Sequence, residues 1–557
     1  MPLFFKDRIP DPIHGENNRY YDALASNGTV KLSDFKLVLK NNIPMDKLGD
    51  PANAGNFNFA SGNRLFRAAS AGETHKGNIV SLISADGVIP TKTTRAIAAQ
   101  GPAYSTSRLD FGYLRLSDTK LLLIYHDRMV VATVNFANKT VAFGTALITS
   151  QTNYTMQGQG LIVRDFDESS SAMMFCMWFG SLTPSYVPAI YTISASGDVI
   201  SAASWGSFFS TTHTSATNPA KVGSTSVLVC TADSSNIYAS LFECATGTPA
   251  LTTRVQMAAS GVTLRHTLFC TDKAAGKYLL IYATSASVYA VVITVSGNNV
   301  SFGTPQLLGT KNDTIYPEGL TYMPGGMNVS EGSGKIILIN NTPGQSYGPS
   351  RMQVFSVNTS GVVSKGAIYD MPIQHITERP GSSCLTYNKS GKIYLTGADF
   401  EVTPRNPCLL EIALNGTNAS MKKYKPFRAL DTTDNYVTVY GRNAVYENPN
   451  NPDELLFIQG FQAAPVANLT VWFGRRTDCM NPGNIMGIAI DEPENGYVRV
   501  QTTAKYLPDL FTGLSMGQSY TAGDNGSLMP YTGASGTNPL GFAASPADFQ
   551  FFGATNW

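Results

Sequence analysis

A short strand of almost uninterrupted apolar residues recurs about seven times along this chain, at intervals of roughly 50 to 60 residues. Each copy leads into a second strand, then a turn rich in Gly or Asn, and then a third strand. Gly and Asn adopt positive φ at little steric cost, so these turns are typical of hairpins. The opening strands are Lys120–Tyr125, Met173–Trp178, Ser226–Cys230, Lys277–Tyr282, Lys335–Asn340, Lys392–Thr396 and Glu454–Gln459.

The opening strands are apolar at nearly every position, which indicates that protein covers both of their faces. A strand with one face in water would alternate between apolar and polar residues instead. In a β-propeller, neighbouring blades cover both faces of such a strand. An array of β-sandwiches is the structural alternative, and contiguous units of similar length favour the propeller. The sequence therefore predicts an all-β chain with a seven-bladed β-propeller over residues 78–481.

The two ends of the repeat region predict how the ring closes. The last unit contains the strand Asn468–Phe473 but no clear outermost strand after it. Upstream of the first unit, Val80–Ile89 resembles the outer hairpin Tyr191–Ile200. We therefore predict that the Val80–Ile89 hairpin completes the last blade and removes an open sheet edge.

The flanks do not fit the repeat. We expect residues 1–77 to form an N-terminal docking segment and residues 482–557 to form a small C-terminal β module. Each piece is too small to bury a core of its own, so each is expected to dock on a partner surface.

Composition excludes several classes of protein. Charged residues make up only 14% of the chain and the net charge is +1, which argues against a nucleic-acid surface. No apolar run approaches the length of a membrane span, and the absence of a signal peptide predicts synthesis in a cytoplasm. The seven cysteines contain no C-x-x-C pair, which favours free buried thiols such as Cys176, Cys230 and Cys270.

The C-terminal flank has a skeleton of short glycine-containing strands: Met486–Ile490, Gly496–Val500, Phe511–Tyr520, Gly526–Leu528 and Pro539–Ala543. It contains a Gly-x-Ala strand, a Gly-Leu-x-x-Gly-x-x-Tyr strand and a closing Leu-Gly-x-Ala strand. This skeleton resembles a small β module of tail fibres and other virion proteins of tailed bacteriophages.

The resemblance implies a structural and interaction component of a phage particle, such as a tail fibre, a baseplate protein or a receptor-binding protein. Such a protein would be made in the host cytoplasm and located in the virion. Its expected partners are other virion proteins, in a homo- or hetero-oligomer, and a glycan or receptor of the host surface.

The sequence contains no recognisable catalytic constellation. Asp boxes of the sialidase type are absent. Gly513–Gly517 matches the Gly-x-Ser-x-Gly elbow of esterases, but it lies in a predicted strand and no His follows it. The acidic clusters Asp165–Glu168 and Asp491–Glu494 are expected to be solvated turns instead of Ca²⁺ sites. We therefore expect no enzyme, no cofactor and no metal. Two alternatives stay open: a propeller glycosidase or depolymerase that degrades host-surface polysaccharide, and a free sugar-binding lectin.

Two groups of residues are candidates for contact with partners. The aromatic residues Trp205, Phe208 and Phe209, in or near a blade-edge loop, are candidates for binding a glycan or another protein. Apolar residues of the two flanks are candidates for assembly contacts, because small pieces need a partner surface to bury them. They are Leu37, Leu39, Phe511, Leu514, Phe542, Phe551 and Phe552.

Overall fold

The chain folds into two compact units, one formed by residues 95–476 and one formed by the segments before and after them. The computed structural model describes residues 57–553, except for gaps at 59–62, 69–71, 83–86, 94, 102–110, 126–127, 149–153, 166–169, 181–184, 207–214, 218, 263–268, 273–275, 285, 311–325, 329–333, 342–349, 359, 373–384, 388–391, 399–406, 425–442, 462–467, 479–484 and 534–538. The larger unit is called the ring and the smaller one the base unit.

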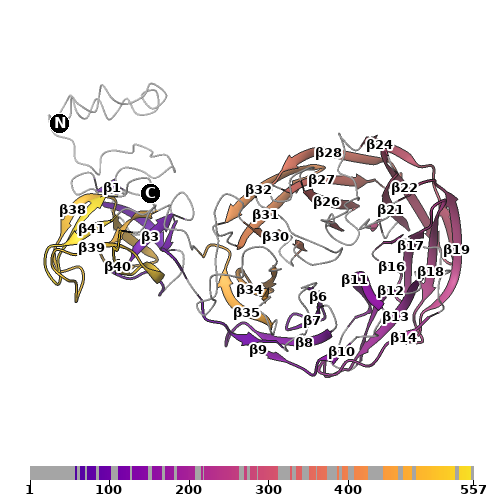
Figure 1. Cartoon of the computed structure of the whole chain (residues 1–557), viewed down its shortest axis with the longest axis horizontal. Helices are drawn as coiled ribbons and strands as arrows, with labels where there is room; N and C mark the ends of the chain where they lie inside the picture. The colour runs from indigo at the N-terminus through magenta and orange to yellow at the C-terminus, as the bar shows by residue number, and fades with distance from the viewer. Residues whose placement is uncertain are drawn as a thin grey trace, which may run out of the picture. The chain divides into compact units, whose positions relative to one another are not determined.

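The ring consists of antiparallel sheets arranged around a centre, as in a β-propeller (Figure 1). The described residues form seven sheets, numbered here in chain order. Sheet 1 contains β6 (Phe111–Arg115), β7 (Lys120–Tyr125), β8 (Arg128–Asn135), β9 (Thr140–Phe143) and β10 (Leu147–Ile148), and sheet 2 contains β11 (Tyr154–Arg164), β12 (Ala172–Gly180), β13 (Ser185–Ile193) and β14 (Ser204–Trp205). Sheet 3 contains β15 (Ser215–Ala216), β16 (Ala220–Val222), β17 (Ser226–Ala232), β18 (Asn236–Glu243) and β19 (Ala250–Ala258). Sheet 4 contains β20 (Phe269–Asp272), β21 (Lys277–Ala283), β22 (Ser287–Ser296), β23 (Asn299–Phe302) and β24 (Gln306–Thr310).

Sheets 5 to 7 repeat the same order of strands. Sheet 5 contains β25 (Gly326–Asn328), β26 (Lys335–Asn341), β27 (Ser350–Val357) and β28 (Val363–Asp370). Sheet 6 contains β29 (Leu385–Tyr387), β30 (Ile393–Ala398), β31 (Pro407–Asn415) and β32 (Asn418–Tyr424). Sheet 7 contains β33 (Asn443–Asn448), β34 (Asn451–Phe461), β35 (Asn468–Arg475) and β5 (Ala99–Gln100).

The apolar strand of each repeat is covered on both faces, as predicted. In β7 the side chains of Leu121, Leu122 and Leu123 are all fully buried. Leu122 packs with side chains of sheet 2 such as Met174, whereas Leu121 and Leu123 pack with side chains of sheet 7 such as Leu456. Side chains alternate between the faces of a strand, so a strand between two neighbouring sheets must be apolar at every position.

The ring closes in sheet 7, where a strand from the start of the ring pairs with its last strand. Gln100 of β5 lies opposite Thr470 of β35, and Ala99 lies opposite Val471. The amide of Gly101 donates a hydrogen bond of 2.7 Å to the carbonyl of Leu469. An N-terminal segment therefore supplies the outer strand that the last repeat lacks.

The prediction that the Val80–Ile89 hairpin supplies this strand is wrong. Its strands, β3 (Ile79–Leu82) and β4 (Gly87–Pro90), belong to the base unit, where β3 pairs with β36 (Ile485–Ala489). Val80 and Ile89 are fully buried there, whereas Gln100 in β5 is exposed. A hairpin that is buried at nearly every position suits a core, and an outer strand needs only one buried face.

The base unit combines the two ends of the chain. One sheet has the order β1 (Phe57–Asn58), β2 (Asn63–Ala68), β37 (Tyr497–Gln501), β36, β3 and β4. The other has the order β38 (Thr503–Leu507), β42 (Phe549–Gly553), β41 (Gly541–Ala543), β39 (Ser519–Ala522) and β40 (Leu528–Pro530), with a 3₁₀ turn at Asp524–Gly526. The predicted boundaries at 77/78 and 481/482 thus differ from the observed ones at 94/95 and 476/477, because the N-terminal strands complete the C-terminal module.

The predicted strand Phe511–Tyr520 is a strand only from Ser519 onward. Gly513 and Gly517 lie in turns with φ of 73° and 79°, values that glycine adopts without steric cost. The spacing of these glycines in the sequence marks two turns and no esterase elbow.

Among the described residues, Cys176, Cys230 and Cys244 are free and buried. The prediction of free buried thiols is confirmed for Cys176 and Cys230, and the side chain of Cys270 lies outside the described residues. Burial, together with the nearby charge of Glu243, raises the pKa of Cys244 to about 12.

Glu243, at the end of β18, predicts an acid-sensitive contribution to stability. Burial alone would raise its pKa, but a hydrogen bond with the side chain of Thr225 leaves that pKa lowered, together with hydrogen bonds from the amides of Ala245 and Cys244 and from Ser226 Oγ, each of these three 2.9 Å long. A lowered pKa stabilises the folded state at neutral pH, and this stabilisation is lost as the pH falls through the folded-state value. We expect Glu243→Gln to unfold at lower urea concentration than wild type at pH 7, and this difference to shrink as the pH falls below the ordinary glutamate pKa of about 4.3.

The control for this titration is Glu494→Gln, which changes an exposed carboxylate of the base unit. Its midpoint in urea should lie close to that of wild type at pH 7. A Glu243→Gln midpoint that differs from wild type by the same amount at pH 7 and in acid would contradict the assignment.

Candidate functional site

In the first sheet of the ring, the residue that opens the apolar strand reaches a turn of the next sheet. In sheet 1 this residue is Lys120, whose Nζ donates a hydrogen bond to the carbonyl of Ser196 and lies 3.6 Å from Oδ1 of Asp198, both in a turn of sheet 2. In sheet 7 the same position is occupied by Glu454. The turn next to it is Phe136–Lys139 of sheet 1. The charge of the opening residue is therefore reversed where the ring closes.

That turn is also unusual in its backbone. The turn after the third strand of sheets 2 to 6 places a glycine at positive φ in each case: Gly197, Gly247, Gly297, Gly361 and Gly416. In sheet 1 the residue at positive φ is Lys139, with φ of 53°. A residue with a Cβ atom is less stable there than glycine by about 1 kcal/mol. Local folding alone would favour glycine at position 139.

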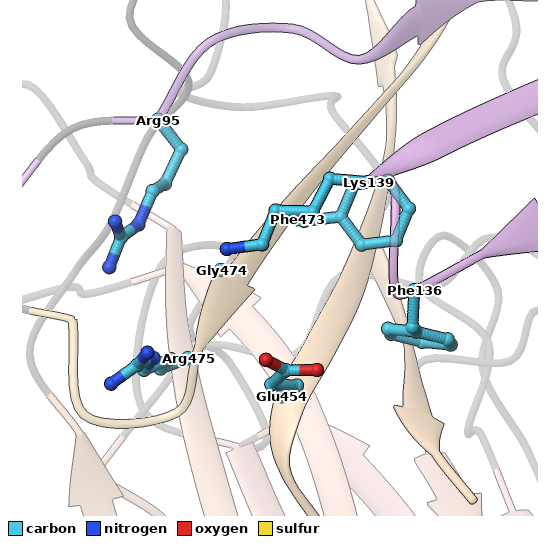
Figure 2. A pocket seen from close by; sticks show the side chains of 7 residues that line it. All are labelled: Arg95, Phe136, Lys139, Glu454, Phe473, Gly474 and Arg475. Atoms are coloured by element: carbon cyan, nitrogen blue, oxygen red, sulfur yellow. The ribbon is translucent and has the colours of Figure 1, made fainter. Parts of the chain in front are cut away.

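Lys139 lines a pocket between sheets 7 and 1 (Figure 2), which is called the seam pocket. Glu454 and Arg475 are direct partners across β34 and β35, so their side chains share one face of sheet 7. Arg95 comes from the segment that leads into β5, and Figure 2 shows the nitrogen of Lys139 turned toward the side on which Arg95 lies. The described residues that line it are Arg95, Phe136, Lys139, Glu454, Phe473, Gly474 and Arg475.

The seam pocket has an apolar part as well as a charged part. The rings of Phe136 and Phe473 meet edge to face, with their centroids 5.3 Å apart. Phe136 also lies 6.1 Å from the ring of Tyr446 in β33. Phe136 is partly exposed, so an aromatic surface borders the charged groups. Among the described side chains that line the pocket, three are cationic and one is anionic.

The other face of sheet 7 carries a second charged cluster. Side chains alternate along strands, so Asp453 and Arg476 point away from the face that holds Glu454 and Arg475. Nη2 of Arg476 lies 2.9 Å from Oδ1 of Asp453, and Nη1 lies 2.9 Å from Oε2 of Glu411 in sheet 6. The hydroxyl of Tyr424 donates to the same oxygen of Glu411 at 3.1 Å.

This second cluster stabilises the junction of sheets 6 and 7. Burial by itself lowers the pKa of Arg476, but Tyr424, Glu411 and Asp453 raise it above its ordinary value. Burial, with the charge of Glu411 nearby, raises the pKa of Tyr424 to about 12. Tyr424 is therefore a poor nucleophile near neutral pH, and the cluster acts as a set of ion pairs between the sheets.

The structure describes only one of the predicted glycan-contact residues. Trp205 lies in the short strand β14, partly buried, with its ring 6.0 Å from that of Trp178. Phe208 and Phe209, like Leu37 and Leu39, lie outside the described residues.

In the C-terminal module, the predicted assembly residues differ in exposure. Phe551 is fully buried in the core of the base unit, so its side chain is not at a surface. Phe511 and Leu514 are partly buried against that same core. Phe542 and Phe552 are 37% and 45% exposed, with their rings 6.0 Å apart. The alternation along β42 explains the difference between Phe551 and Phe552, since neighbouring residues face opposite sides.

Sequence reasoning missed the seam pocket. Its signal is nevertheless visible in the repeats, because Glu454 stands where four other repeats open with Lys. Lys139 stands in a turn for which other repeats use glycine. Both departures occur at the junction where the two ends of the ring meet.

In the described part of the chain, no group of three or more His, Cys, Asp or Glu side chains lies together as a metal site requires. Asp491 instead pairs with Arg499, and Glu492 lies 3.2 Å from Nδ1 of His75. No helix among the described residues has the length and apolar character of a membrane span.

Comparison with known proteins places the chain among β-propellers by fold only. No known family matches its sequence, and no curated protein matches either. The WD40 domain of SCAP from fission yeast is similar over 75% of this chain and 99% of that one, with 8% identity and a TM-score of 0.35. The NanB sialidase of Streptococcus pneumoniae is similar over 70% and 72%, with 11% identity and a TM-score of 0.36. An α-L-arabinofuranosidase of Fusarium graminearum is similar over 70% and 99%, with 12% identity and a TM-score of 0.32.

These structures correct one expectation from the sequence. The expectation that the chain is not an enzyme is withdrawn, because two of these three propellers are enzymes, a sialidase and an arabinofuranosidase, so a fold of this kind does not exclude catalysis. The lack of a recognisable motif in one sequence is therefore no argument against catalysis. At identities and TM-scores this low, the likeness concerns the fold and assigns no substrate to this chain.

Proposed function

We propose that this protein is a component of a tailed-phage particle that recognises a polysaccharide of the host surface through its ring. The observation that carries the proposal is the order of the chain. The ring is one continuous insertion, residues 95–476, and the base unit is formed by the segments on both sides of it. Both ends of the ring are therefore connected along the chain to the same unit.

The base unit supplies the attachment in this proposal. Its C-terminal half contains the Gly-Leu-x-x-Gly-x-x-Tyr and Leu-Gly-x-Ala strands that resemble phage virion modules. Tyr506, Met529, Phe542 and Phe552 of the same half have large exposed apolar side chains. Exposed apolar groups gathered on one small unit favour contact with another protein.

The ring supplies the recognition, and we infer that its seven described sheets are the complete set of blades. Sheet 1 packs against sheet 2 on one side and against sheet 7 on the other, which is the arrangement of a closed ring. Recognition of a polysaccharide is compatible with its cleavage, so the proposal includes the polysaccharide-degrading alternative.

Three measurements test the proposal. Mass spectrometry of purified particles should detect peptides of this chain at a fixed ratio to other virion proteins. The purified full-length protein should bind host cells and host polysaccharide, and an assay for reducing sugar in the same samples separates binding from cleavage. Absence from particles would refute the virion role, and a failure to bind host polysaccharide would refute the recognition role.

A further inference from the structure

We propose that a second copy of this chain covers one face of the base unit, so that two copies pair around a two-fold axis. The inference rests on the proposed function, because it names a partner to which the base unit attaches. The face belongs to the sheet β38–β42–β41–β39–β40 and is turned away from the core, and it is called the outer face. Its side chains are Tyr506, Thr521, Met529, Phe542, Gln550 and Phe552.

The pairing of the strands places these side chains on one side of the sheet. Gln550 of β42 lies directly opposite Tyr506 of β38 and directly opposite Phe542 of β41. Direct partners on antiparallel strands point to the same side. The chain neighbours of Gln550, Phe549 and Phe551, are fully buried against the other sheet of the base unit. One side of the sheet is therefore core, and the outer face is the opposite side.

Exposed apolar side chains are concentrated on this sheet. Nine large apolar side chains are exposed in the described part of the chain, of which five belong to residues 506–552 and four are spread singly over sheets 2 to 5. Tyr506, Phe542 and Phe552 are between 37% and 46% exposed, and the rings of the two phenylalanines lie 6.0 Å apart. Adjacent exposed aromatic rings are typical of the centre of a protein interface.

The polar chemistry of the outer face favours a second copy over a different protein. None of its six side chains carries a formal charge at neutral pH. The carboxylate of Asp548, just before β42, already accepts hydrogen bonds from the hydroxyl of Tyr506 and the amide of Asp509. A two-fold axis sets a surface against itself, so a charged face would meet its own charge and a neutral face does not. Gln550 and Thr521 both donate and accept hydrogen bonds, so each can bond to its own kind.

The exposed area is close to what a weak dimer needs. If a whole aromatic side chain offers about 200 Å², the exposed parts of Tyr506, Phe542 and Phe552 amount to roughly 250 Å² per copy. Met529 and the polar neighbours would bring the area buried by two copies to about 1,000 Å² in total. This is the low end for specific interfaces, so we expect a dissociation constant of micromolar order.

The first experiment is analytical ultracentrifugation of the full-length protein, across about two decades of concentration around the micromolar range. Wild type should pass from the mass of one chain to the mass of two chains. A two-fold pair contains each ring twice, so Phe542→Thr combined with Phe552→Thr should weaken pairing by at least about a hundredfold. Threonine suits a strand. Leu307→Thr, at an exposed position of sheet 4, is the control and should leave pairing unchanged.

A second experiment places charge on the outer face and decides the question even if the phenylalanine variant does not fold. Gln550→Lys and Gln550→Glu should each pair more weakly than wild type, because like charges then face each other. An equimolar mixture of the two variants should regain pairing, because opposite charges then face each other. A cover supplied by another part of the same chain would not respond to the mixing of two variants.

Three results would overturn the proposal. The first is the mass of one chain at every concentration, as expected if another virion protein or another part of the chain covers the outer face. The second is a dimer that neither the phenylalanine changes nor the Gln550 changes weaken. The third is a mass of three or more chains, which excludes a two-fold pair. All three leave the virion role standing, whereas a dimer that is absent from purified particles would refute only that role.

Discussion

Leu122→Asp is expected to yield no folded ring. Leu122 is fully buried in β7 and packs in the core between sheets 1 and 2. Replacing it with aspartate would place an unpaired carboxylate in that core, at a cost of several kcal/mol. Because a folded domain is stable by only about 5–15 kcal/mol, we expect insoluble protein or the loss of a cooperative melting transition.

Leu307→Asp is the matched control, because it makes the same chemical change on the same fold. Leu307 lies in the outer strand β24 and its side chain is 63% exposed. We expect that variant to be soluble and to melt close to wild type. Ile337→Asp, at a fully buried position of β26, should behave like Leu122→Asp. Soluble protein with a wild-type melting curve from either buried variant would show that these strands are not central.

Arg476→Met is expected to weaken the junction between sheets 6 and 7. It removes ion pairs to Glu411 and Asp453 and leaves Glu411, which is 22% exposed, without its cation. Breaking a fully buried pair typically costs 3–5 kcal/mol, and partial exposure reduces this, so we expect a loss of about 1–3 kcal/mol. The measurement is the free energy of unfolding in urea at pH 7.

Arg115→Met is the control for this prediction. Arg115 forms an ion pair with Asp118 in which both side chains are almost half exposed, at 46% and 45%. Exposed pairs contribute about 0–1 kcal/mol, so this variant should lie close to wild type. Equal losses from the two arginine variants would mean that the Arg476 cluster has no special part in stability.

The sequence alone determined the class of fold. A strand that is buried on both faces can be recognised in the sequence as an uninterrupted run of apolar residues. The strand predicted in this way at Lys277–Tyr282 is observed as Lys277–Ala283. Glycine at positive φ leaves a local mark too, as in the turns at Gly197 and Gly361. Such features depend on neighbours along the chain, so they can be read from one sequence.

Ring closure and the candidate site were decided only by tertiary structure. The closing strand, Ala99–Gln100, is too short to show a sequence pattern of its own. The nearby hairpin Val80–Ile89 has a clearer strand pattern, so the sequence favoured it as the closing strand. That hairpin is drawn into the base unit because its apolar faces complete a core with strands from the other end of the chain. The seam pocket brings Arg95 and Lys139 to residues more than 300 positions later in the chain. The repeats mark Lys139 and Glu454 as departures from the pattern, but that these residues come together depends on the final packing of all the sheets.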